Sequence, residues 1–160
     1  TSVSSSEGVI VVPAFVGLGA PYWDDKARGA IFGLTRGTTQ AHLARATLES
    51  LAFQTRDVLE AMQKDSGIRL KTLKVDGGAV RNNYLMQFQS DILQKKVEVS
   101  VCQEASAYGA ALLSGEKAEI YDDKVLSDLR ACQVYEPKMP ESKRQEKWQG
   151  WRNAMEKVLR

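Results

Sequence analysis

The sequence predicts an α/β fold whose sheet has a parallel component. Short apolar runs alternate along the chain with longer segments in which apolar residues recur every three or four positions, so strands and helices are expected in turn. Of the 160 residues, 43% are hydrophobic and 26% are charged, and the formal net charge is +2. These globular values exclude a disordered chain, and the small net charge argues against an electrostatic nucleic-acid binder. No apolar run reaches about 18 residues, so a membrane-spanning helix is not expected.

The first part of the chain predicts a strand, a loop, a short apolar element and a long helix. Residues 9–15 form an apolar, β-branched run, which predicts a buried strand that ends near Pro13. A loop rich in Gly and Pro follows at 17–23, and residues 30–34 are expected to form a strand or a buried turn. From about residue 39 to 64 the apolar period is helical. The core face expected for this helix consists of Leu48, Leu51, Thr55, Val58, Leu59 and Met62.

The remainder of the chain predicts two strand–helix pairs and a terminal helix. Gly67 is expected to end the long helix in a left-handed cap. The strands are expected at 73–75 and 97–101, and the helices at 82–93 and 107–114. The terminal helix is amphipathic, and its apolar stripe is expected to pack into the core: Trp148, Trp151, Met155 and Leu159.

The strongest local motif is the turn Asp76-Gly77-Gly78, which separates a predicted strand from the helix that begins near Asn82. Glycine lets a ligand approach the backbone without a clash with a Cβ atom. The helix start offers unpaired N–H groups and the positive end of the helix dipole, and ligands bind at strand carboxyl ends in open α/β sheets. These features favour phosphate or nucleotide binding, but an ordinary tight turn between strand and helix explains the spacing equally well.

Other reactive side chains carry weaker signals. His42 is the only histidine, which excludes a site built from two or more histidines, and its position predicts a polar residue in the first turn of a helix. Asp24 and Asp25 could ligate a metal, but polar loop residues are the expected interpretation and no metal site is predicted. Cys102 and Cys132 match neither a disulfide framework nor a zinc pattern, so two reduced cytosolic thiols are expected.

Several longer stretches carry motifs of one protein family. They are VPAF at 12–15, GLGAPYWD at 17–24, ARGAIFGLTRG at 27–37, LESLAFQTRDVL at 48–59, VDGGAV at 75–80, NN at 82–83 and LMQFQSDIL at 85–93. Within residues 29–49, Gly33-Leu34, His42-Leu43 and the run from Ala46 to Glu49 have the spacing of the second FGGY signature. Together these motifs resemble the FGGY carbohydrate kinases, and the glycerol kinases among them, strongly over residues 8–94 and moderately over 95–115.

The resemblance implies an actin-like ATPase fold, of the ribonuclease H type, that is incomplete at its N-terminal end. Residues 1–7 are then expected to be a linker and residues 8–160 the nucleotide-side, C-terminal domain of the kinase. It also implies that Gly78 and Asn82, with Gly77 beside them, bind ATP or ADP, and that this chain holds no catalytic residue.

The resemblance further implies an activity and partners. The glycerol kinases that the chain resembles transfer the γ-phosphoryl group of ATP, with Mg²⁺, to the terminal hydroxyl of glycerol, and cytoplasmic location is expected. The expected partners are the N-terminal kinase domain, which supplies the polyol site and the Asp general base, and further copies in a homo-oligomeric full-length enzyme.

Some departures from the family pattern keep other interpretations open. Arg81 stands where a small residue is more usual, and the small-residue helix runs into charged residues at 116–119 instead of an apolar continuation. The segment 104–107 also resembles xylulokinases. The alternatives are therefore another FGGY sugar kinase, such as a xylulokinase, and a non-catalytic nucleotide-binding or interaction fragment.

Overall fold

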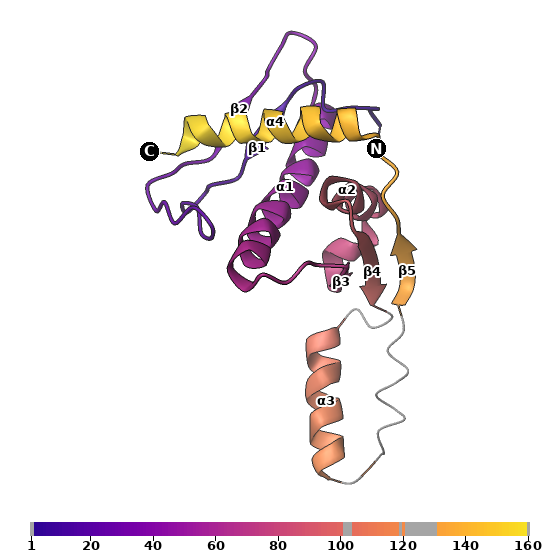
Figure 1. Cartoon of the computed structure of the whole chain (residues 1–160). Helices are drawn as coiled ribbons and strands as arrows, with labels where there is room; N and C mark the ends of the chain where they lie inside the picture. The colour runs from indigo at the N-terminus through magenta and orange to yellow at the C-terminus, as the bar shows by residue number, and fades with distance from the viewer. Residues whose placement is uncertain (1, 101–103, 119, 121–130, 160) are drawn as a thin grey trace.

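The structure, a computed structural model, describes residues 2–100, 104–118, 120 and 131–159. In chain order its elements are β1 (Ile10–Val12), β2 (Ala30–Phe32), α1 (Gln40–Ser66), β3 (Thr72–Val75), the 3₁₀ helix η1 (Gly78–Arg81), α2 (Asn83–Leu93), β4 (Lys96–Ser100), α3 (Ala105–Lys117), β5 (Ala131–Tyr135) and α4 (Glu141–Val158). Figure 1 shows α4 lying across α1 and the β1–β2 pair, whereas α3 extends away from the other helices.

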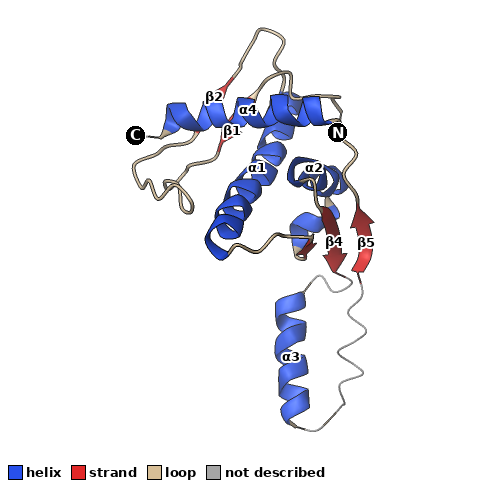
Figure 2. Ribbon diagram, in the orientation of Figure 1, coloured by secondary structure: helices blue, strands red, loops and turns tan. Residues whose placement is uncertain are grey.

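The described strands form two small sheets (Figure 2). β1 and β2 pair antiparallel, with Val11 opposite Ile31, so the segment expected to be a strand or a buried turn is a strand. In the other sheet β4 lies between β3 and β5. β3 and β4 run parallel, which confirms the predicted parallel component, and α2 is the helix between them. β5 pairs antiparallel with β4 and was not predicted from the sequence.

The long helix α1 turns a different face to the core than its apolar pattern predicts. Its buried residues are Ala46, Glu49, Ser50, Ala52, Phe53 and Asp57. On the predicted face, Leu51 is 42% exposed and Met62 is 58% exposed, and the other members are only partly buried, so that prediction is wrong. The physical reason is that Glu49 and Asp57 accept hydrogen bonds from side chains of other helices, which allows carboxylates to occupy core positions.

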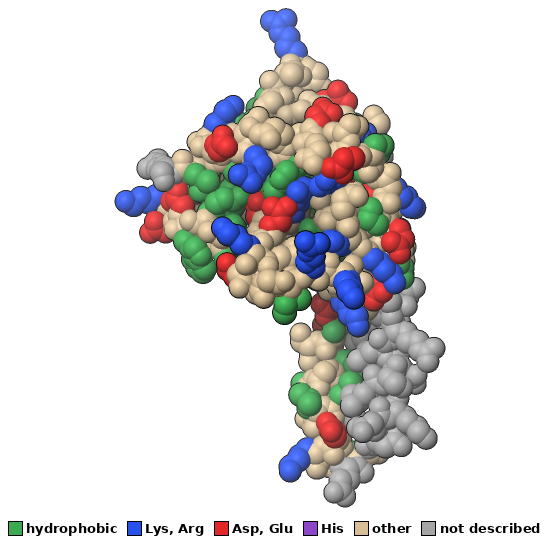
Figure 3. Space-filling model, in the orientation of Figure 1, with side chains coloured by type: hydrophobic (Ala, Val, Ile, Leu, Met, Phe, Trp, Pro, Cys, Tyr) green, Lys and Arg blue, Asp and Glu red, His purple; other side chains and the backbone are tan. Residues whose placement is uncertain are grey.

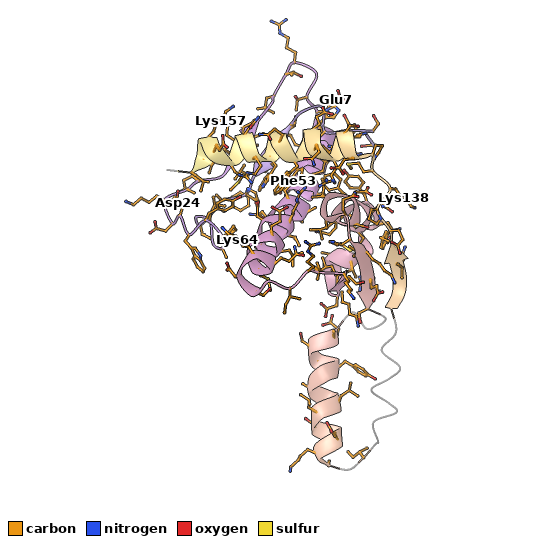
Figure 4. The ribbon with its side chains drawn as sticks, viewed as in Figure 1. Glu7, Asp24, Phe53, Lys64, Lys138 and Lys157 are labelled. Atoms are coloured by element: carbon orange, nitrogen blue, oxygen red, sulfur yellow. The ribbon has the colours of Figure 1, made fainter. Side chains whose placement is uncertain are left out.

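Phe53 of α1 lies at the centre of the core, near the crossing of α1 and α4 (Figure 4). Its ring stacks on that of Trp151, with ring centroids 5.2 Å apart, and it meets Phe88 of α2 edge-on at 5.5 Å. Such aromatic pairs contribute about 0.5–1.5 kcal/mol beyond the burial of their area. Trp151 is fully buried and Trp148 nearly so, which confirms that the terminal helix packs its tryptophans into the core. This core fixes α1 and α2 against each other beside the candidate site.

The surface carries both signs of charge. On the face shown in Figure 3, basic and acidic side chains are interspersed over the body of the molecule, as the net charge of +2 leads one to expect. Among the described helices, none combines the length and the apolar character that crossing a membrane requires.

Candidate functional site

The turn after β3 contains two adjacent glycines in different conformations. Gly77 has φ 86° and ψ −179°, a region of backbone space that is essentially restricted to glycine. Gly78 begins η1 with an ordinary φ, it is exposed, and a Cβ atom added there would meet no atom within 4 Å. The fold therefore requires glycine at position 77, whereas nothing in the described structure requires it at position 78. Glycine at position 78 is what close approach of a ligand to the backbone would need.

Asn82 is the N-cap of α2. Its Oδ1 accepts a hydrogen bond from the backbone N–H of Leu85 at 3.0 Å, and its own backbone has extended angles. The capping role that the residue type allows is thus present. Among the hydrogen bonds found between described residues, none uses the Asn82 amide nitrogen. The half-buried side chain can therefore cap its helix through the oxygen and still donate from the nitrogen to a ligand.

Gly78 and Asn82 line the same surface hollow, which has a volume of about 710 Å³. Its wall comes from the turn, from the start of α2 and from α1, and consists of Leu48, Leu51, Gly78, Ala79, Arg81, Asn82, Asn83, Tyr84 and Leu85. The volume lies in the range of small-molecule sites, about 300–1,000 Å³. Gly77 is not part of this wall, and its role in the structure is to shape the turn. An apolar wall beside a glycine backbone and an amide suits a flat, polar-edged ring such as a nucleobase.

Sequence reasoning identified two of these wall residues, and it missed the apolar ones. Leu48 and Leu51 were assigned to the core, but they project from α1 into the hollow. Tyr84 comes only two residues after Asn82, yet the local motif gave no reason to select it. Its hydroxyl donates to the Glu49 carboxylate at 2.6 Å. Burial, and after it the nearby Glu49 carboxylate, raise the pKa of Tyr84 far above its usual value, so the phenol stays protonated and donates.

His42 and Asp24, the other candidate residues, make hydrogen bonds that stabilise the local backbone. His42 forms a capping box at the start of α1, where its Nδ1 accepts from the Thr39 backbone N–H at 3.1 Å. Asp24 accepts from the backbone N–H groups of Lys26 and Ala27, so it holds a loop turn. Within the described ranges, no group of three or more His, Cys, Asp and Glu side chains is placed to hold a metal. The expectation for the two cysteines lies outside the described residues, because these include neither Cys102 nor the side chain of Cys132.

Comparison with known proteins gives consistent matches. Residues 1–116 match the model of the FGGY family of carbohydrate kinases, C-terminal domain. The solved structure of Plasmodium falciparum glycerol kinase with ADP is 42% identical, with a TM-score of 0.89, over 99% of this chain and 32% of that chain. Xylulose kinase from Rhodospirillum rubrum is 26% identical, with a TM-score of 0.72, over 94% of this chain and 30% of that one. Gluconate kinase from Lactobacillus acidophilus, at 24% identity over 94% of this chain and 32% of that one and a TM-score of 0.73, shows the fold alone.

The chain thus spans about a third of the length of the solved kinases that it matches. Its mixed helices and strands superpose on a defined part of each of them rather than on the whole. With a family match over residues 1–116 and 42% identity to a glycerol kinase over 99% of its length, the chain belongs to the FGGY family of carbohydrate kinases, as part of a C-terminal domain with the actin-like ATPase fold.

Proposed function

We propose that the chain is the nucleotide-binding part of an ATP-dependent glycerol kinase, which converts ATP and glycerol to ADP and sn-glycerol 3-phosphate. The observation that carries the proposal is that Gly78 and Asn82 line one hollow. The relative that supports it is a glycerol kinase solved with ADP, at 42% identity. A xylulose kinase, the alternative sugar kinase, stands at 26% identity, which favours glycerol as the substrate.

Four wall residues and the neighbouring Gly77 have roles in this proposal. The adenine ring would lie against Leu48 and Leu51 and approach the backbone at Gly78, where a side chain would obstruct it. The Asn82 amide nitrogen would donate to the ring edge or to the ribose. Gly77 keeps the turn in the shape that exposes Gly78. Phosphoryl transfer depends mainly on positioning and on charge neutralisation, and this chain would contribute the positioning of the nucleotide.

In this proposal, the carboxylates that bind Mg²⁺ or take the proton of the acceptor hydroxyl lie outside the hollow. Among the described residues that line the hollow, none is Asp or Glu, so the hollow offers no carboxylate to Mg²⁺ or to the acceptor hydroxyl. Mg²⁺, when bound with the nucleotide, would neutralise phosphate charge. The polyol site and the general base are assigned to the N-terminal kinase domain, which is the principal partner in this proposal.

The test is the affinity for ADP, measured by titration calorimetry on the full gene product. Gly78→Val should weaken ADP binding at least about tenfold, about 1.4 kcal/mol, because two methyl groups would stand where the nucleotide meets the backbone. The melting temperature should not change, since a Cβ atom at Gly78 meets nothing within 4 Å. Gly37→Val is the matched control, because Gly37 is also exposed, lacks a left-handed φ and would give its Cβ only an ordinary contact of 3.8 Å. Unchanged ADP affinity in folded Gly78→Val protein would remove this site from consideration.

The polyol is tested separately. The full gene product should have a higher kcat/KM for glycerol than for xylulose in an ADP-release assay. The opposite ratio would replace the glycerol assignment with the xylulokinase alternative and leave the nucleotide site unaffected.

A further inference from the structure

A buried carboxylate on α1 connects four parts of the molecule. Glu49 is only 3% exposed, and each of its two oxygens accepts two hydrogen bonds. Oε1 accepts from the Tyr84 hydroxyl at 2.6 Å and from Arg45 Nε at 3.1 Å. Oε2 accepts from Lys147 Nζ at 2.9 Å and from Ser6 Oγ at 3.2 Å. The donors come from the N-terminal segment, α1, α2 and α4, so one side chain fixes the relative positions of all four.

Such a carboxylate is stable in the interior only because its hydrogen-bonding capacity is used in full. A buried charge without partners costs several kcal/mol, and two cations and two hydroxyls surround Glu49. An apolar residue at this position would fill space at no desolvation cost. The polar arrangement therefore defines a geometry more strictly than packing alone would.

The Tyr84 ring is held on the side that faces the hollow. Its hydroxyl is tied to Glu49, the guanidinium of Arg45 lies 4.3 Å from its centroid, and the ring stacks on Phe88 at 5.8 Å. Tyr84 also lines the hollow and lies in the first turn of α2, directly beyond the cap formed by Asn82. Any movement of this ring would shift both a wall of the hollow and the first turn that Asn82 caps.

We propose that Glu49 is a positioning residue for nucleotide binding, which acts by holding the hydroxyl of Tyr84 and so fixes the wall of the hollow and the start of α2. The inference rests on the proposed function, because the ligand of the hollow is taken to be a nucleotide. Glu49 itself is not among the residues that line the hollow, so its effect on the ligand passes through Tyr84.

The same helix offers a matched control. Asp57 is a second buried carboxylate of α1, 7% exposed, and it accepts a hydrogen bond from Trp151 Nε1 at 2.8 Å. Neither Asp57 nor Trp151 lines the hollow. Replacing either carboxylate with the corresponding amide removes one buried charge and perturbs stability, but only the change at Glu49 alters the support of Tyr84.

The experiment compares Tyr84→Phe, Glu49→Gln, the double variant and Asp57→Asn in the full gene product. We expect Tyr84→Phe and Glu49→Gln each to weaken ADP binding by about three- to tenfold in calorimetry. The double variant should bind no more weakly than the weaker-binding single variant. Glutamine keeps one acceptor oxygen, for which the charged donors Arg45 and Lys147 compete, so both changes act on the contact to the Tyr84 hydroxyl. Asp57→Asn should bind ADP like the wild type, even where its melting temperature falls. In steady-state assays the KM for ATP should rise in the first two variants while kcat stays constant.

Tyr84→Phe is the milder change, because it keeps the ring and leaves Glu49 with three donors, so it tests the proposal even if Glu49→Gln fails to fold. ADP affinities for Tyr84→Phe that equal those of Asp57→Asn would overturn the inference. A folded Glu49→Gln protein with wild-type affinity would overturn it as well. Failure of the proposed function gives a different result, namely Gly78→Val protein that binds ADP as the wild type does. Weakened binding in Gly78→Val with normal binding in Tyr84→Phe refutes the role of Glu49 alone.

Discussion

Replacement of Asn82 separates helix capping from ligand binding, because the structure assigns the two roles to different atoms of one side chain. The oxygen caps α2 by accepting from the Leu85 N–H at 3.0 Å. The nitrogen is the group proposed to donate to the nucleotide. Asn82→Ala removes both atoms, whereas Asn82→Ser keeps an oxygen that caps about as well as asparagine and removes only the nitrogen.

The two effects have different magnitudes. Loss of a cap costs about 1 kcal/mol, which lowers the melting temperature by about 2–4 °C in a domain of this size. Loss of one hydrogen bond to the nucleotide costs about 0.5–1.5 kcal/mol, which weakens ADP binding by about 2- to 12-fold. Asn82→Ala should therefore show both effects. Asn82→Ser should show the weaker binding with a nearly unchanged melting temperature.

Thermal unfolding and calorimetric ADP titration of both variants, on the same preparations of the full gene product, measure these quantities. The decisive variant is Asn82→Ser, because its cap is intact. If Asn82→Ser binds ADP as tightly as the wild type, the side chain is a cap only and its amide nitrogen contacts no nucleotide. A fall in melting temperature equal to that of Asn82→Ala would instead show that serine does not replace the cap, and the stability argument would be refuted.

Two further predictions concern pH and activity. Burial raises the pKa of Asp57 above its ordinary value of 3.8, so the stabilising contribution of this group is complete below about pH 3.8 and is lost as pH rises through the raised pKa. Asparagine keeps an acceptor for Trp151 without titrating. The melting temperature of Asp57→Asn should therefore rise relative to that of the wild type between about pH 4 and pH 7. A difference between the two melting temperatures that stays constant over this range would contradict the explanation. The purified 160-residue chain should release no ADP in a glycerol-dependent manner, since the acceptor and its base are assigned to another domain. Turnover near 1 s⁻¹, at the low end of the usual kinase range of about 1–100 s⁻¹, would show that the chain contains catalytic residues.

The sequence was sufficient for the order of the elements from β1 to α3, for the terminal helix and for the turn, because these depend on local chemistry, but it did not predict β5. The β-branched run before Pro13, the stop at Gly67 and the tryptophans of the terminal helix all occupy the expected structures. Gly78 and Asn82 were selected from the turn motif and the family resemblance, and the structure places both at one hollow. Their contact with a nucleotide stays a prediction.

Contacts with other segments of the chain determine which face of α1 is buried, and the local sequence does not reveal these contacts. The apolar period of α1 favours Leu48 and Leu51 as core residues, but periodicity does not reveal that Glu49 accepts hydrogen bonds from three other segments of the chain, in addition to Arg45 of its own helix. One of those donors, Lys147, lies 98 residues away in the sequence. Because Glu49 and Asp57 of α1 face the core, Leu48 and Leu51 face the hollow. The sequence around Tyr84 likewise gives no sign of its place at the hollow, because that place depends on its contact with Glu49 of another helix.

Gly77 and Gly78, the two neighbouring glycines of the turn, are glycine for two different physical reasons. Gly77 is set by the geometry of the chain itself, since its φ of 86° strains any side chain with a Cβ atom. Gly78 has no such constraint within the described structure and would be set by a molecule outside the chain. A laboratory selection that rewarded only a soluble fold would therefore retain glycine at the first position and let the second drift, whereas a selection for growth on the kinase reaction would retain both.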